Sequence, residues 1–135
     1  MAIARRQLRP YRIDAQVRSH AKRLADQWRA AGFDVDIVEY LQTSSEAGGY
    51  TMTAQGPSAV LSCRCQSWAV GMWPWLRRPL WTIAVSVRTG DNARLQEVGT
   101  AAGWEHQAAW DQVQKWIDGE GTLPASLDDA LAALP

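Results

Sequence analysis

Residues 59–88, AVLSCRCQSWAVGMWPWLRRPLWTIAVSVR, contain the strongest β-strand pattern of the chain and decide its fold. In residues 81–88 every second side chain is large and apolar, which is typical of a strand with one buried face. Residues 59–67 follow the turn signal Gly56-Pro57 and are expected to form the preceding antiparallel strand. These two strands are therefore predicted to be the third and fourth strands of an antiparallel sheet.

The rest of the chain is predicted to supply two more strands and several helices. In chain order these are a helix over residues 14–31, strands over 33–41 and 50–55, helices over 94–102 and 104–118, and a short helix that begins at Ser126. Short turns favour an α+β domain with an N-terminal helix, a four-stranded antiparallel meander and C-terminal helices on one face. The opposite sheet face is expected to be solvated, with Ser62, Arg64, Gln66, Thr82, Ser86 and Arg88 on it.

The length of 135 residues fits one small domain. We expect a basic arm over residues 1–13, a single domain over 14–119, and a linker with a short helix over 120–135. Charge is uneven along this organisation: residues 1–30 hold eight cations and two acids, whereas residues 89–135 hold eight acids and two cations. Such asymmetry indicates either a nucleic-acid-binding end or two ends of the chain that pair with each other.

Composition also narrows the class of protein. The 47% apolar content is that of a globular chain, so general disorder is not expected. No stretch is long and apolar enough to span a membrane, and the N-terminus lacks the apolar core of a secretory signal. A cytoplasmic location is therefore the default expectation.

The segment at residues 71–81, GMWPWLRRPLW, is the most unusual part of the sequence. Its two prolines exclude a continuous helix or a central strand, yet its composition is too apolar for an ordinary loop. Four interpretations are open: a lid over the core, a docking site for a protein, a membrane-surface anchor, and a stacking platform for single-stranded nucleic acid. We favour docking of a protein partner. The binding residues predicted for it are Trp73, Trp75, Arg77 and Arg78.

The alternative hypothesis is a nucleic-acid-binding module built on the arm and the first helix. Phosphate contacts would come from six cations, Arg5, Arg6, Arg9, Arg12, Arg18 and Lys22. Acidic residues in the C-terminal half count against this interpretation because they repel the nucleic-acid backbone.

No motif indicates catalysis, and we identify no family from the sequence. Cys63 and Cys65 could combine with His20 and His106 as metal ligands or as a nucleophile and base. However, one residue between cysteines does not match zinc-site spacing, and both cysteines are expected on an apolar strand face. We therefore expect a non-enzymatic accessory protein with no catalytic residues, no metal site and no cofactor.

Overall fold

The computed structural model describes residues 8–10, 15–40, 48–57, 59–71, 78–90 and 94–134. Within them the chain forms an antiparallel sheet with the strand order β2-β3-β4-β5-β6, and a further short strand, β1, pairs with β4. The elements in chain order are β1 (Leu8–Pro10), α1 (Ala15–Ala30), β2 (Asp34–Tyr40), β3 (Gly49–Gln55), β4 (Ala59–Val70), β5 (Arg78–Thr89), β6 (Gln96–Gly103), α2 (His106–Ile117) and α3 (Leu127–Ala132). This arrangement confirms the α+β class and the antiparallel sheet.

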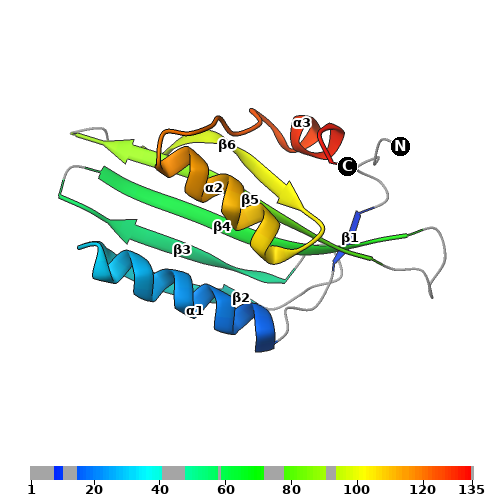
Figure 1. Ribbon diagram of the computed structural model, residues 1–135, viewed down its shortest axis with the longest axis horizontal. Helices are drawn as coiled ribbons and strands as arrows, with labels where there is room; N and C mark the ends of the chain where they lie inside the picture. The colour runs from blue at the N-terminus through cyan, green and yellow to red at the C-terminus, as the bar shows by residue number, and fades with distance from the viewer. Residues whose placement is uncertain are drawn as a thin grey trace.

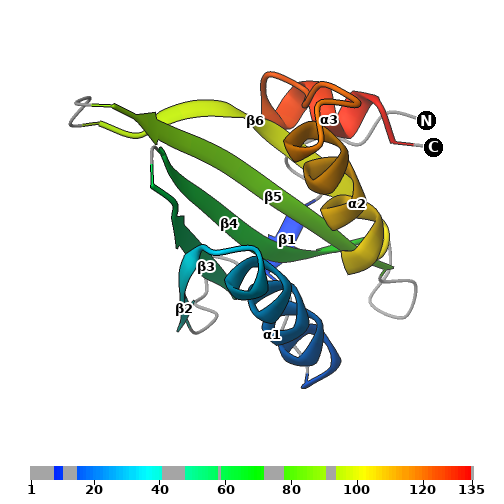
Figure 2. The same cartoon turned by 60° about the vertical axis from the view of Figure 1, so that its left-hand side comes forward.

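Helices α1 and α2 lie on the same face of the sheet, α1 against β2 and α2 against β5 and β6 (Figures 1 and 2). Helix α1 buries Ala21, Ala25 and Trp28, which recur at helical spacing, and it ends before Gly32, whose positive φ of 98° suits a residue without a side chain. Trp28 meets Trp110 of α2 edge-to-face, with ring centroids 5.8 Å apart. Both helices thus share one hydrophobic core with the inward side chains of β2–β6.

The short C-terminal helix is confirmed. Ser126 caps α3 by accepting a hydrogen bond from the backbone N–H of Asp129 (3.2 Å). The segment before it is attached to the sheet edge, because the Thr100 N–H donates to the carbonyl of Pro124 (2.8 Å). The predicted linker therefore covers the outer edge of β6, and α3 packs against the same strand (Figure 2).

The predicted helix over residues 94–102 is wrong, and so is the number of four strands. Residues 96–103 form β6, which completes a five-stranded meander to which β1 is added. A bulge between Val85 and Ser86 of β5 shifts the register with β6 and interrupts the alternation that would have indicated a strand. Pairing with β5 outweighs local helix propensity here. Gly99 and Gly103 lie where neighbouring atoms leave no space for a Cβ.

The hairpin formed by β4 and β5 is longer than predicted at its closed end, where segment 71–77 connects the two strands. β4 continues to Val70 and β5 begins at Arg78, so Arg78 and Pro79, expected in a loop, belong to a strand. Pro79 is tolerated because β6 pairs with β5 only from Trp81 onward, which leaves the start of β5 at a sheet edge.

One side chain expected on the solvated sheet face is buried. Thr82 is only 4% exposed, and its hydroxyl accepts a hydrogen bond from the indole N–H of Trp68 (2.9 Å). Trp68 thus shields part of a face that the sequence pattern alone marks as polar.

Candidate functional site

The closed end of the β4–β5 hairpin extends beyond its neighbouring strands. Pairing of β3 with β4 stops at Gln66, and pairing of β6 with β5 stops at Trp81, but β4 and β5 pair with each other as far as Val70 and Arg78. Three residue pairs therefore lie past the main sheet, a distance of about 10 Å at the usual rise per residue. β1 covers one side of this extension through Leu8, Arg9 and Pro10, which face Val70, Ala69 and Trp68.

Of the four predicted docking residues, only Arg78 falls within the described part of the chain. Trp73, Trp75 and Arg77 lie outside it. Arg78 is exposed, and its guanidinium lies 4.2 Å from the ring centroid of Trp104, the residue that follows β6. Trp104 was not among the predicted site residues, because no local pattern links it to a position 26 residues earlier.

The residues of the nucleic-acid alternative are distributed over separate elements. Arg5, Arg6 and Arg12 lie outside the described residues. Arg9 occupies a register position in β1, and Lys22 is exposed on α1. Arg18 forms an ion pair with Glu39 of β2 (3.3 Å), so part of its charge is already compensated within the protein.

A buried polar cluster lies between the sheet and α2. The indole N–H of Trp110 donates to the Tyr50 hydroxyl (2.8 Å) and to Nε2 of His106 (3.0 Å), and the Tyr50 hydroxyl is 2.6 Å from that same nitrogen. All three side chains are almost fully buried, at 1% to 5% exposed. His20 of α1 stacks near His106, with ring centroids 5.7 Å apart.

The two cysteines lie in this interior as free thiols. Burial raises the pKa of the Cys65 thiol to about 12, although the neighbouring Tyr50 hydroxyl opposes part of this rise. Burial, and then the adjacent Cys65, also raise the pKa of Cys63, and burial raises that of Tyr50. A nucleophile needs a lowered pKa and access to its substrate, so these thiols have the properties of core residues.

This burial predicts slow thiol chemistry. At pH 8 a thiol with a pKa near 12 has about one thiolate in ten thousand molecules. Folded protein is therefore expected to react with an aromatic disulfide reagent at least about 100-fold more slowly than protein unfolded in urea, as followed by absorbance. Rapid labelling of Cys65 in folded protein, with mass spectrometry locating the adduct, would contradict the buried placement.

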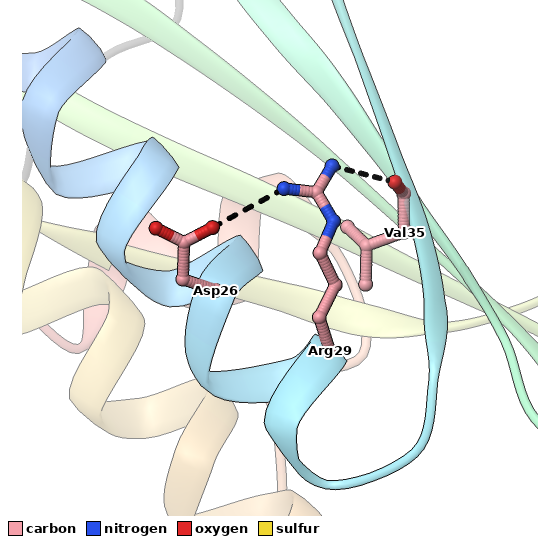
Figure 3. A network of polar contacts seen from close by, with 3 residues as sticks. All are labelled: Asp26, Arg29 and Val35. Carbon is pink, nitrogen blue, oxygen red and sulfur yellow. Dashed lines mark hydrogen bonds and ion pairs between the residues drawn. The ribbon is translucent and has the colours of Figure 1, made fainter.

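The edge strand β2 carries a second polar feature. Arg29 of α1 donates to the backbone carbonyl of Val35 (2.8 Å) and pairs with Asp26 (3.2 Å) (Figure 3).

On the face away from the helices, a hollow of about 300 Å³ is lined by Asp34, Asp36, Val38, Thr53 and Gln55. Acidic side chains on an exposed edge discourage addition of another strand, so this arrangement has a structural explanation.

No group of three or more His, Cys, Asp or Glu side chains in the described ranges is arranged to hold a metal ion. In the same ranges, none of the helices combines the length and apolar character that crossing a bilayer requires.

None of the family models, curated proteins or solved structures with which the chain was compared matches it.

Proposed function

We propose that the protein is a small binding protein that docks a protein partner through residues 71–81, with Trp73, Trp75, Arg77 and Arg78 as the main contact residues. The observation that supports this is the extension of β4 and β5 beyond β3 and β6. Segment 72–77 connects the two strands of this extension, whose three residue pairs continue the nine β4–β5 pairs within the main sheet. Trp and Arg are the residues most enriched in the energetic centres of protein interfaces.

The pairing of Val70 with Arg78 also favours docking, because it fixes the distance between the two ends of the segment. A binding segment with fixed ends loses less conformational entropy on association than one with free ends. The nucleic-acid alternative has less support, because Arg18 pairs with Glu39, and Arg29, also on the exposed face of α1, pairs with Asp26. Cations engaged in this way contribute less to phosphate binding than free ones.

A comparison of two double variants tests the proposal. Tagged wild type, Trp73→Ala/Trp75→Ala, and Val38→Ala/Leu95→Ala are used for quantitative capture from nuclease-treated lysate of the source cell. The last variant is the matched control, because Val38 and Leu95 are large apolar residues exposed elsewhere, at 62% and 48%. We expect the tryptophan variant to capture at least tenfold less of a protein partner than wild type does, since each interface hot spot contributes about 2 kcal/mol or more to binding. The control should retain the partner.

The free energy of unfolding shows whether Trp73 and Trp75 belong to a docking segment or to a lid over the core. For a docking segment, Trp73→Ala/Trp75→Ala should unfold in urea within about 0.5 kcal/mol of wild type. A loss of about 3 kcal/mol or more would place the tryptophans in the core and contradict the proposal. Equal capture by wild type and the tryptophan variant would contradict it as well.

A further inference from the structure

The two long helices leave the other face of the sheet accessible over β2 to β5 (Figure 2). On that face, every second residue from the first within 34–38, 51–55, 60–64 and 84–88 points outward, because most side chains between them pack into the core. These twelve residues form the open face, and all of them are exposed or only partly buried. On β6 the same face is covered, since Thr100 and Ala102 are 4% and 5% exposed.

The open face has few charges and mostly short side chains. Asp34 and Asp36 lie on β2, Arg64 on β4 and Arg88 on β5, so the acidic and basic groups are on different strands and balance each other. Of the eight neutral residues, seven are Val, Thr, Ser or Ala. Such short side chains let a second sheet approach to the usual spacing of stacked sheets, about 10 Å.

The hollow of about 300 Å³ lies within the open face, beside Asp34 and Asp36. Its two carboxylates are complementary to an arginine, and Arg88 lies on the same face. Asp34, Gln55, Val60 and Arg88 are successive partners across the four strands, so Arg88 is about 14 Å from the hollow in its own sheet. That distance is too long for an arginine side chain, but Arg88 of a second copy can enter the hollow from above.

A twofold axis parallel to the strands, between β3 and β4, brings two open faces into this relation. β2 of one copy then lies over β5 of the other, β3 lies over β4, and each residue keeps its level along the strands. Val38, which is 62% exposed, becomes covered. Three residues of β2 gain neutral or oppositely charged neighbours in the second copy, namely Asp34 with Arg88, Asp36 with Ser86, and Val38 with Ala84.

Charge favours this arrangement over other ways of stacking the same faces. An axis through β4 would place Asp36 over Glu97 of β6, which is the partner of Ser86 at the same level. An axis perpendicular to the strands would place the acidic β2 strands of both copies against each other. Both alternatives bring like charges together, which costs binding energy. The whole chain has a net charge of zero, so two copies do not repel each other in general.

The size of the open face indicates a weak dimer. Strand spacing and rise per residue give it about 20 by 20 Å, a projected area of about 400 Å² per copy. Stable protein interfaces bury about 800 Å² of accessible surface per partner, so this face is at the small end of the range. We therefore expect a Kd in the micromolar range rather than the nanomolar range.

We propose that the open face of β2 to β5 binds a second copy of this chain in a weak twofold dimer, in which Arg88 of each copy enters the hollow beside Asp34 and Asp36 of the other. Stacking of two faces leaves the outer edge of β2 unpaired, so it is compatible with the acidic side chains that discourage strand addition there. The inference is independent of the proposed function, because the open face and residues 71–81 share no residue.

Sedimentation equilibrium of the full chain, at concentrations from about 5 to 500 μM that bracket the expected Kd, tests the inference. The variants are Asp34→Arg and Arg88→Glu, each of which creates two like-charge contacts in the dimer. They are measured alone and as an equimolar mixture. Arg23→Glu is the matched control, because Arg23 is an exposed arginine on α1, on the other side of the sheet. Circular dichroism verifies that each variant is folded.

We expect wild type and Arg23→Glu to dimerise with the same Kd. Asp34→Arg and Arg88→Glu should each raise the Kd at least about tenfold, because like charges then face each other. Their equimolar mixture should dimerise again, since both contacts between the two variants join opposite charges. Wild type that stays monomeric over the whole range would overturn the inference. A mixture that stays monomeric, or equal Kd values for Arg88→Glu and Arg23→Glu, would overturn it too.

Discussion

Replacing Trp110 with alanine is expected to lower the free energy of unfolding by about 3–5 kcal/mol, the usual cost of deleting a buried tryptophan side chain. Trp110 is 2% exposed and packs edge-to-face against Trp28, so its loss leaves a cavity where α1 and α2 meet. It also removes the N–H that donates to Tyr50 and His106. Urea unfolding followed by circular dichroism measures the change.

Two further variants separate packing from hydrogen bonding. Trp110→Phe keeps an aromatic ring but removes the indole N–H, and it should cost about 1–3 kcal/mol. Tyr50→Phe should cost about 1 kcal/mol, because the Trp110 N–H still has Nε2 of His106 as an acceptor at 3.0 Å. The loss of stability in the double variant Trp110→Phe/Tyr50→Phe should differ from the sum of the two single losses by at least about 0.5 kcal/mol, as expected of side chains in one network. Strict additivity, or a Trp110→Ala protein as stable as wild type, would contradict the buried cluster.

The second large effect is expected at Gly99, where even one methyl group has no space. A Cβ at this position would collide with the carbonyl oxygen of Pro124 and lie 2.8 Å from Cβ of Leu123. The linker would have to move away from β6, which breaks the hydrogen bond from the Thr100 N–H to Pro124. We therefore expect Gly99→Ala to destabilise the protein by about 1–3 kcal/mol, within the range for overpacked sites.

Gly121→Ala is the matched control for this prediction. A Cβ at Gly121 would approach nothing closer than Lys115 at 3.9 Å, so this variant should stay within about 0.5 kcal/mol of wild type. Hydrogen exchange provides a second measurement, because the Thr100 amide should lose protection in Gly99→Ala and keep it in Gly121→Ala. Equal stability of the two variants would show that the linker does not pack against β6.

Local patterns are sufficient for every element except β1 and β6. The helix predicted over residues 14–31 and the short helix predicted from Ser126 each depend on interactions within a few residues, and both are confirmed. Strands β2 to β5 were recognised for the same reason, because their alternation follows from one buried face. Strand β6 was missed because its register with β5 contains a bulge and its glycines fit a neighbour distant in sequence.

The candidate site depends on contacts between distant segments even more than the fold does. The sequence by itself determined which residues are available for binding, namely tryptophans beside arginines at 71–81 and arginines at 1–13. It could not show that β1 pairs with the end of β4, or that the Arg78 guanidinium lies over the ring of Trp104. Nor could it show that Tyr50, His106 and Trp110 share hydrogen bonds across separations of up to 60 residues. Composition and periodicity are local properties of a chain, whereas such contacts form only when the sheet brings distant segments together, and for this reason the tertiary structure alone decided them.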